Sequence, residues 1–528
     1  MGPWKASPGI VRDKRQSTPN ARALLHELQC YCHRNTLAPT LKFLSLDTEG
    51  RKWSTRGTGI LAAISRRTSQ AVSERPNPLC VVGAGYVGLV SAVCLADSGV
   101  DVRLLDIDTT RLAVLRKGGT PIHEPLLNEL LASVLGSGRL TLCDDGAVAM
   151  RGAEVIMVAV GTPPLADGRA DLTQVRAAVT EAVRHAGLDT VIVIKSTVPP
   201  GTTESLRSLC RHKGRQIPLA VCPEFLAEGS AVRDFRQPPQ VVIGGDDKGA
   251  CERVSQLFGH LDTPIRITDA TSAELVKYGV NAFLALKISF INEIAQLCEF
   301  TGADVSSVAD GIGSDDRIGR AFLGAGLGFG GSCFPKDVRA LNQVASYHGQ
   351  SFQLLRAAVE VNQHARSRFV AKIQRALNGK LAKRRIAVLG LAFKPGTDDV
   401  RQAASIDVIR HLEDLGASVV VTDPVAGANA RPLLPNTEFV DDPYDCVKSA
   451  DAVLLVTEWP DYVKLDWSRV AGLVRRQIVV DGRNCLDSDS LVELGFTYIA
   501  VGRPIRKPTT VKSAHSGARR AADVLAMR

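Results

Sequence analysis

The ten residues 328–337, with the sequence GFGGSCFPKD, combine the residue types of an activated thiol. Cys333 follows three glycines, and Lys336 and Asp337 come within the next four positions. Glycine lets the backbone approach a bound molecule, and an ammonium group lowers the pKa of a nearby thiol by favouring the thiolate. The pattern predicts a nucleophilic Cys333 assisted by Lys336. The alternative is a small buried hydrophobic side chain, because most cysteines are of that kind and the chain has 12.

A glycine-rich turn, GAGYVG, follows the apolar segment LCVV of residues 79–82 and precedes an apolar helical run. In this order Gly83 permits a tight turn, Gly85 leaves room for a pyrophosphate, and Gly88 packs the helix against the strand. A second apolar strand ends at Asp106, whose carboxylate can accept hydrogen bonds from the adenosine ribose and would repel a 2′-phosphate. The arrangement predicts a Rossmann-type domain that binds NAD in preference to NADP.

Two further apolar strands end in small and hydroxyl residues, one at GTPP with Thr162 and one at KSTVPPGT with Thr197. In an open parallel sheet these carboxyl ends form the ligand crevice. The next segment, CPEFLAEG, adds Glu224 and Glu228. The two carboxylates would share one face of a helix, but the flanking proline and glycine make an active-site loop equally compatible with the sequence. A solvated acidic turn is the alternative.

One long helix is predicted from Thr271 to about Phe300, with Thr271 or Ser272 as its N-cap. Lys277 and Asn281 are four residues apart, so their side chains project from the same face. A surface lysine beside a polar neighbour is the usual explanation. The apolar residues on either side of Lys277 favour a helix that lines a cleft.

A second α/β unit is predicted from apolar strands that begin at Ile386, Ser418, Ala452 and Ile478. It contains no GxGxxG sequence, so it is expected to bind something other than a second dinucleotide. Three basic residues follow strand ends, where they suit an acidic ligand: Lys394, Arg401 and Arg483.

The basic character of the chain is confined to its ends. The 528 residues carry a formal charge of +9, but residues 1–78 have 13 Lys and Arg against 5 Asp and Glu, and residues 503–528 have 7 against 1. The part between them is therefore slightly acidic, which argues against a nucleic-acid groove in the folded region. The length predicts about three domains. The leader is expected to be mostly disordered, a transit peptide, or sequence upstream of the true start codon.

Cysteine spacing and hydropathy restrict the class of protein further. The cysteines form no CxxC pair and no Cys/His cluster at zinc spacing, which predicts free thiols in a reducing cytoplasm and no metal centre. No uncharged apolar run reaches about 18 residues, so no membrane span is expected.

The order of these motifs resembles the nucleotide-sugar 6-dehydrogenases of the UDP-glucose/GDP-mannose dehydrogenase family over about residues 79–502. The motifs that carry the resemblance are GAGYVG, GTPP, KSTVPPGT, PEFLAEG, AELVKYGVNAF, DDRIG, GFGGSCFPKD, LAFKPGTDD and DGRN. The resemblance implies an α/β fold with two Rossmann-like, doubly wound domains joined by a long central helix. It divides the chain into five regions: a basic, disordered extension (1–78), an NAD-binding domain (79–270), a central helical dimerisation domain with the nucleophile (271–383), a UDP-sugar-binding domain (384–502) and a basic disordered tail (503–528).

The resemblance also implies a reaction. Two NAD molecules oxidise the C6 alcohol of a nucleotide sugar to a carboxylate, and Cys333 holds the intermediate first as a thiohemiacetal and then as a thioester. Lys277 is expected to stabilise the oxyanion with Asn281 beside it, and Asp337 to assist proton transfer with the Thr197 hydroxyl. Glu224 is expected to act in hydrolysis of the thioester.

Binding residues follow from the same resemblance. Residues implied for NAD are Gly83, Gly85, Tyr86, Val87, Gly88, Asp106, Arg111, Thr162, Thr197, Glu228, Lys336 and Arg401. Residues implied for the sugar nucleotide are Phe225, Leu226, Ala227, Glu228, Lys277, Asn281, Phe322, Gly324, Gly328, Gly330, Phe393, Lys394 and Arg483, with Arg317 reaching the substrate of a neighbouring subunit in a homodimer.

The PEFLAEG loop favours UDP-glucose as substrate, while GDP-mannose and a UDP-N-acetylhexosamine remain alternatives. A β-hydroxyacid dehydrogenase would share the first domain but needs neither Cys333 nor the second unit. A non-catalytic sugar-nucleotide sensor is a further alternative. The sequence departs from the family pattern at Cys222, where asparagine is common, at Gln402-Ala403, where Glu-Ser is usual, and in both basic ends.

Overall fold

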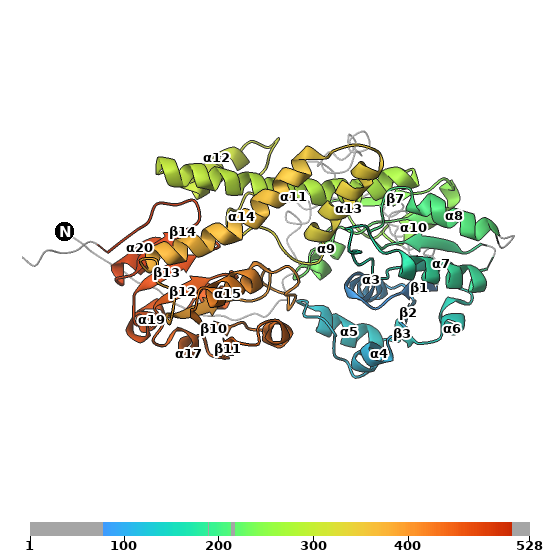
Figure 1. Ribbon diagram of the computed structural model, residues 1–528. Coiled ribbons are helices and arrows are strands. Elements are labelled where there is room, and N and C mark those ends of the chain that lie inside the picture. Colours follow the sequence, from blue (N-terminus) through green and yellow to red (C-terminus); the bar gives the residue numbers. More distant parts are fainter. Residues whose placement is uncertain (1–77, 188, 213–216, 509–528) are drawn as a thin grey trace, which may run out of the picture. The chain divides into compact units, whose positions relative to one another are not determined.

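A computed structural model describes residues 78–187, 189–212 and 217–508 (Figure 1). The extension predicted for residues 1–78 lies outside the described residues except for its last position, and so does the predicted tail from residue 509 onward.

The first sheet has eight strands in the order β3-β2-β1-β4-β5-β6-β7-β8. Its neighbouring strands are parallel except for β6 and β7, which are antiparallel. The order of the first six strands is that of a dinucleotide-binding fold, whose crevice opens between β1 and β4, where the direction of the winding reverses. The strands are β1 (Leu79–Val82), β2 (Val102–Leu105), β3 (Leu140–Cys143), β4 (Val155–Val158), β5 (Val191–Ile194), β6 (Leu219–Val221), β7 (Val241–Gly244) and β8 (Ile265–Thr268).

Both faces of this sheet are covered, which explains why its strands are continuous apolar runs and not alternating ones. Val81 and Val193 point into the core on one face, and Cys80 and Ile192 into the core on the other. The helices are α3 (Tyr86–Asp97), α4 (Thr109–Arg116), α5 (Leu127–Gly136), α6 (Gly146–Met150), α7 (Thr173–His185), α8 (Thr202–His212), α9 (Ala231–Arg236) and α10 (Lys248–Gln256).

The long helix α11 (Ala270–Thr301) has 32 residues and spans about 48 Å. Its N-cap is Asp269, whose carboxylate accepts a hydrogen bond from the backbone N–H of Ser272 at 2.8 Å. The prediction of Thr271 or Ser272 as the cap was therefore wrong, because the aspartate satisfies the first turn two residues earlier. Gly302 ends the helix in the left-handed conformation. Helix α11 packs against α13 (Phe334–Tyr347) and α14 (Gln353–Ala376), and α12 (Val305–Gly313) follows it.

The second sheet has six parallel strands in the order β11-β10-β9-β12-β13-β14, coloured orange to red in Figure 1. Counted in chain order, this is the same order as in the first six strands of the other sheet. Its strands are β9 (Arg385–Leu389), β10 (Ser418–Thr422), β11 (Glu438–Phe439), β12 (Ala452–Leu455), β13 (Ile478–Asp481) and β14 (Thr497–Ala500). Its helical segments are α15 (Ala404–Asp414), α16 (Gly427–Ala430), η1 (Arg431–Leu433), α17 (Pro443–Val447), α18 (Pro460–Val463), α19 (Trp467–Leu473) and α20 (Ser488–Glu493).

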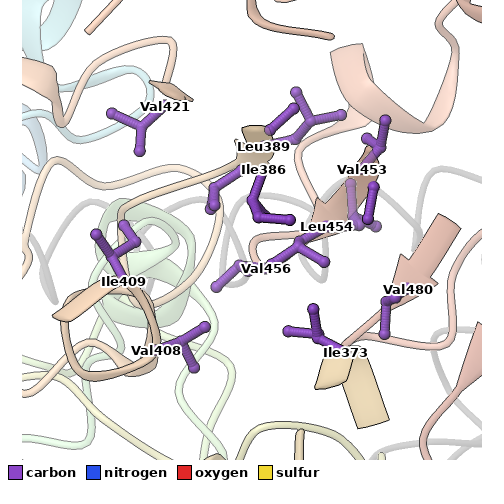
Figure 2. Close-up of a cluster of buried hydrophobic side chains, with 14 of the residues drawn as sticks. Ile373, Ile386, Leu389, Val408, Ile409, Val421, Val453, Leu454, Val456 and Val480 are labelled. Carbon is purple, nitrogen blue, oxygen red and sulfur yellow. The ribbon is translucent and has the colours of Figure 1, made fainter. Parts of the chain in front are cut away.

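The core of the second unit joins this sheet to the central helices. Figure 2 shows strand residues such as Ile386 and Leu454 packed with Val408 and Ile409 of α15 and with Ile373 of α14. Helix α14 thus contributes to the second core while its other contacts are with α11 and α13.

The predicted fold class, two Rossmann-like sheets with a long helix, is confirmed. One boundary differs: Arg506 pairs with Tyr498 through both backbone hydrogen bonds, and Arg503 forms an ion pair with Asp304. The chain is therefore packed for several residues beyond position 502, where the disordered tail was expected to begin. None of the described helices is long and apolar enough to cross a membrane.

Candidate active site

The glycine turn between β1 and α3 has room for a phosphate. Gly83 has a φ of +103°, and a side chain there would lie 2.7 Å from the carbonyl oxygen of Ala159. At Gly88 a Cβ would lie 1.8 Å from the carbonyl oxygen of Gly83, so only glycine lets helix α3 approach the turn. At Gly85 a Cβ would meet nothing within 4 Å. This open position at the start of a helix fits the pyrophosphate of NAD.

Asp106, at the end of β2, is buried and anchors the same turn. Its carboxylate accepts hydrogen bonds from the backbone N–H groups of Ala84, at 2.6 Å, and Asp108, at 2.8 Å. Arg111 of α4 donates to it at 2.8 Å. The carboxylate thus has the position expected for a ribose contact, although several chain donors already share it.

The tips of β4 and β5 lie together, as the parallel order requires. The Thr162 hydroxyl donates to the carbonyl oxygen of Thr197 at 3.0 Å. Next to Thr197, the Ser196 hydroxyl donates to the carbonyl oxygen of Val160 at 2.6 Å. These bonds join the two strand ends, and the Thr197 side chain is half-buried.

Cys333 is half-buried at the N-terminus of α13. Burial, and after it the carboxylate of Glu224, raises the pKa of the thiol to about 11, while Lys277 lowers it. The predicted partner, Lys336, instead forms an ion pair with Asp337 at 2.5 Å. The prediction that Lys336 activates the thiol was therefore wrong, because the lysine that favours the thiolate comes from α11.

Four polar side chains from three segments meet beside Cys333. Lys277 of α11 lies 3.0 Å from a carboxylate oxygen of Glu224, and both side chains are buried. One turn further along α11, Asn281 donates to Asp337 of α13 at 2.6 Å. Burial favours the neutral amine of Lys277, but Glu224, Cys333 and Asp337 outweigh it and raise its pKa. A charged ammonium group next to the thiol suits the stabilisation of an oxyanion.

The segment from Pro223 to Gly229 is a loop, which decides between the two alternatives that the sequence left open. Its end is fixed by a residue that the sequence analysis missed, Glu124, which accepts from the N–H of Gly229 at 2.7 Å and from the hydroxyl of Tyr86. Tyr86, predicted for NAD, therefore also holds this loop. An isolated glutamate about 100 residues away offers no sequence signal for such a contact.

Glu228 occupies the junction of three segments. It accepts a hydrogen bond from Ser332 at 2.7 Å and lies 3.4 Å from the guanidinium group of Arg401, which itself pairs with Asp399. Burial and then the Asp399 carboxylate raise the pKa of Glu228 from its ordinary 4.5 to about 7, against the opposing effects of Ser332 and Arg401. The sequence analysis missed Ser332 and Asp399.

The glycines before Cys333 serve the packing of the chain itself. A side chain at Gly328 would lie 2.2 Å from the amide oxygen of Asn362, and one at Gly330 would lie 2.4 Å from the carbonyl oxygen of Gln402. Asn362 of α14 in turn pairs with both backbone groups of Phe329, at 2.6 and 3.0 Å. These glycines were predicted to let the backbone approach a substrate. At these two positions the structure shows instead that they let the backbone approach other parts of the protein.

Three basic residues of the second unit follow strand ends: Lys394 and Arg401 after β9, and Arg483 after β13. Burial lowers the pKa of Lys394. Arg483 donates to the carbonyl oxygens of Val456, at 2.6 Å, and Phe393, at 2.9 Å, which orients its guanidinium group at the strand ends. An anionic ligand at this edge would meet at least two cations.

Arg317 and Phe322 have exposed side chains. The Arg317 side chain is 88% exposed and pairs with Asp315 in its own loop. Phe322 is partly exposed and lies beside Phe334, with ring centroids 6.1 Å apart. Exposure of Arg317 is compatible with a contact to another subunit, and its predicted role stays a prediction.

A dinucleotide turn, a second doubly wound sheet and a thiol beside a buried lysine are together the features of a nucleotide-dependent dehydrogenase that uses a cysteine. Three family models match the chain: the NAD binding domain of the UDP-glucose/GDP-mannose dehydrogenase family at residues 77–262, its central domain at 271–364 and its UDP binding domain at 387–488. The chain belongs to the UDP-glucose/GDP-mannose dehydrogenase family, and the resemblance seen in the sequence is confirmed.

Individual relatives agree with this assignment. The chain is 43% identical over 434 residues to the UDP-glucose 6-dehydrogenase of Rhizobium meliloti, covering 81% of this chain and 99% of the relative. It is 42% identical over 441 residues to the enzyme of the same name from Pseudomonas aeruginosa, covering 81% and 97%. The solved UDP-glucose dehydrogenase of Pyrobaculum islandicum is 39% identical, with a TM-score of 0.76, covering 81% of this chain and 98% of that one.

Proposed function

We propose that this protein oxidises the C6 alcohol of UDP-glucose to the carboxylate of UDP-glucuronate, using two NAD. The observation that carries the proposal is the placement of Cys333 beside Lys277 and Glu224, where α11, α13 and the 223–229 loop converge. A single alcohol oxidation requires no thiol, whereas two successive oxidations gain from one that keeps the aldehyde bound. The names of the relatives favour glucose as the sugar.

Each residue of the site has a proposed role in the reaction. The glycine turn after β1 would hold NAD, which would supply the hydride acceptor for each oxidation. The Cys333 sulfur adds to the C6 carbonyl, and the Lys277 ammonium group stabilises the negative charge that forms on oxygen. Asp337, bonded to Asn281, assists proton transfer with the Thr197 hydroxyl. Glu224 then positions and deprotonates the water that hydrolyses the thioester.

The second sheet is proposed to hold the uridine diphosphate. Lys394 and Arg483 supply positive charge at its strand ends, and the segment around Gly324–Gly330 passes beside the uracil. The loop residues Phe225–Glu228 face the sugar. In this proposal residues 79–270 bind NAD, 271–383 form the central domain, and the unit from residue 384 onward binds the sugar nucleotide; the three matching family models support such a division.

A homodimer through α11 is part of the proposal. Phe283, Phe290 and Leu297 recur every seven residues on this helix and are 63%, 49% and 59% exposed. A stripe of this kind favours helix pairing. Arg317 would then reach the substrate of the other subunit. Sedimentation of the purified protein tests this directly, because a monomer that is fully active would contradict it.

The proposed reaction is tested by its stoichiometry. Purified protein is expected to release two NADH per UDP-glucose and little NADH with GDP-mannose or UDP-N-acetylglucosamine. Cys333→Ser is expected to abolish uronate formation while UDP binding stays within about threefold, because only the covalent step is removed. Cys485→Ser is the matched control, because Cys485 is the second half-buried cysteine among the described residues. Uronate output from Cys333→Ser equal to that of the wild type would contradict the mechanism. The ten described cysteines are free, and we propose a cytoplasmic location on that basis.

A further inference from the structure

Ser332 links the proposed nucleophile to a carboxylate that the mechanism above does not use for chemistry. Its hydroxyl donates to an oxygen of Glu228 at 2.7 Å and lies 3.5 Å from the Cys333 sulfur. Because the hydroxyl hydrogen points to Glu228, the hydroxyl oxygen is free to accept a hydrogen bond from the thiol. The three groups therefore form a directed chain from sulfur to carboxylate.

We propose that Ser332 passes the Cys333 thiol proton to Glu228 as the sulfur attacks the carbonyl carbon of the substrate. This inference rests on the proposed function for its substrate, but not for its geometry. Ser332 contacts the reacting sulfur, and Glu228 acts through it as the proton acceptor.

The step is balanced without any further reactant. The S–H bond breaks and an S–C6 bond forms, while the carbonyl electron pair moves to oxygen, next to Lys277. The thiol proton goes to the Ser332 oxygen as the serine proton goes to Glu228. The serine ends as a neutral hydroxyl, the carboxylate ends protonated, and no group is oxidised or reduced.

Burial explains why a relay is needed. The pKa of the thiol is raised to about 11, so a resting thiolate is scarce at neutral pH and the proton must leave as the C–S bond forms. A base whose pKa lies near the working pH is the most effective acceptor. The pKa of Glu228 is raised to about 7, which meets this requirement.

The other two carboxylates near the sulfur receive contacts on both oxygens and are proposed to act in other steps of the reaction. Glu224 receives Lys277 on one oxygen and the N–H of Leu226 on the other. Asp337 receives Lys336 on one oxygen and Asn281 on the other. Glu228 receives Ser332 and Arg401 on one of its two oxygens, and its side-chain contact with the Asp399 carboxylate favours uptake of a proton.

The charged and titratable groups that face Glu228 come from two further elements. Tyr86 of α3 approaches it from the glycine turn, and Asp399, Arg401 and Lys394 approach it from the loop after β9. Arg401 and Lys394 oppose proton uptake and Asp399 favours it. The balance keeps the carboxylate ionised above about pH 7.

The first test needs no substrate. Iodoacetamide alkylation of Cys333, followed by peptide mass spectrometry, is expected to rise through a limb near pH 7 in the wild type. In Ser332→Ala and Glu228→Gln that limb should disappear, and the alkylation rate of Cys333 at pH 7.5 should be lower by about tenfold or more. The rate should then increase only at the higher pH at which the thiol itself loses its proton. Alkylation of Cys485 provides an internal control. An unchanged limb in both variants would overturn the relay.

The second test separates the thiol step from hydride transfer. Net oxidation of UDP-glucose is expected to fall about 100-fold in Ser332→Ala and Glu228→Gln. In Ser332→Ala, reduction of the C6 aldehyde of UDP-glucose by NADH, which needs no thiol attack, should stay within threefold. Ser332→Thr keeps the hydroxyl and should recover much of the oxidation, and Ser346→Ala on the outer side of α13 is the control for folding. Equal loss of both reactions would show a structural role only and overturn the proposal.

The two tests also separate this inference from the proposed function. A wild-type protein that makes no NADH from UDP-glucose contradicts the substrate, yet a lost alkylation limb in the variants would still support the relay. Full activity of the wild type with an unaffected Ser332→Ala would contradict the relay alone.

Discussion

The two doubly wound sheets have the same turn after their first strand but differ in the ligand that this turn suits. Gly83 after β1 and Gly390 after β9 have φ values of +103° and +101°, and each donates its N–H to the carbonyl at the end of the next strand. An aspartate after that strand, Asp106 or Asp423, then accepts hydrogen bonds from the backbone of the turn. The local framework is thus repeated in two regions that share little sequence.

The sheets diverge directly after this turn. In the first, helix α3 begins at Tyr86 and directs its N-terminus at the open position Gly85. In the second, no helix begins until Ala404, and the intervening loop carries Lys394 and Arg401. A helix N-terminus suits the pyrophosphate of a dinucleotide, whereas a long loop with side-chain cations can bind a diphosphate and still reach another segment. Topology alone therefore does not decide the ligand.

The largest expected effect comes from breaking each turn separately. Gly83→Ala is expected to lower affinity for NADH at least 100-fold and leave UDP affinity within threefold, and Gly390→Ala is expected to do the reverse. In both cases a side chain meets a fixed neighbour, the Ala159 carbonyl at 2.7 Å or the Thr457 side chain at 2.4 Å, at a strained φ. Calorimetric titration with each ligand measures this. Gly118→Ala, with a φ of +80° and open space, is the control. Equal loss of both ligands in both variants would remove the proposed division of labour.

A smaller effect is expected at Glu228, which Arg401 of the loop after β9 contacts. Its pKa is 4.5 when unfolded and about 7 when folded, so the folded state binds the proton more strongly and stability falls as pH rises from about 4.5 to 7. Glu228→Gln cannot ionise, so its stability relative to that of the wild type should be higher at pH 8 than at pH 5.5. The difference between the two pH values is at most about 3 kcal/mol in the free energy of unfolding, and it appears as a higher relative melting temperature at pH 8. Calorimetry at both pH values measures it, with the exposed Glu252→Gln as control. A difference independent of pH would mean that Arg401 keeps the carboxylate ionised throughout.

The two aspartates that hold the turns should differ in a third experiment. Asp106→Ala is expected to lower kcat/KM for NAD about tenfold and to raise the ratio of NADP to NAD use, because Arg111 is released to meet a 2′-phosphate. Asp423→Ala removes acceptors for Leu391, Ala392 and Trp459, so it should lower stability without changing the cofactor ratio. Steady-state kinetics with both cofactors checks this. An unchanged ratio in Asp106→Ala would show that Asp106 only supports the turn.

Local patterns predicted most of this framework, and contacts between distant segments account for what they missed. The apolar strands, the GAGYVG turn and the i, i+4 placement of Lys277 and Asn281 are properties of short windows, and the structure has them. The partner of the thiol was misassigned because Lys336 is near in sequence, whereas Lys277, 56 residues away, is near in space. Glu124 belongs to no motif pattern, and Ser332 lies within the GFGGSCFPKD motif but has no role that the motif predicts; their contacts arise only when the loops are brought together.

The smallest expected effect lies in the second unit's loop, at Gln402, which has a φ of +53° and an exposed side chain. Its backbone is fixed by neighbours: the carbonyl accepts from Arg366 at 3.1 Å and would meet any side chain at Gly330. The left-handed conformation costs a residue such as glutamine about 1 kcal/mol, asparagine less and a β-branched residue more. Melting temperature should therefore decrease in the order Gln402→Asn, wild type, Gln402→Val. Gln402→Gly gains from relief of strain and loses through greater freedom of the unfolded chain, so it should stay within about 1 kcal/mol of the wild type.

Because the Gln402 side chain is exposed, this series should leave UDP and NADH affinities unchanged while stability varies, in contrast to Gly390→Ala in the same loop. A loss of UDP affinity in Gln402→Val that exceeds its loss of stability would show that the loop conformation is coupled to ligand binding. The left-handed residue would then be part of how the second sheet, which has no helix at its turn, holds its loop ready for a diphosphate. Equal affinities across the series would place that preorganisation in Gly390 and Asp423, the elements that the second turn shares with the first.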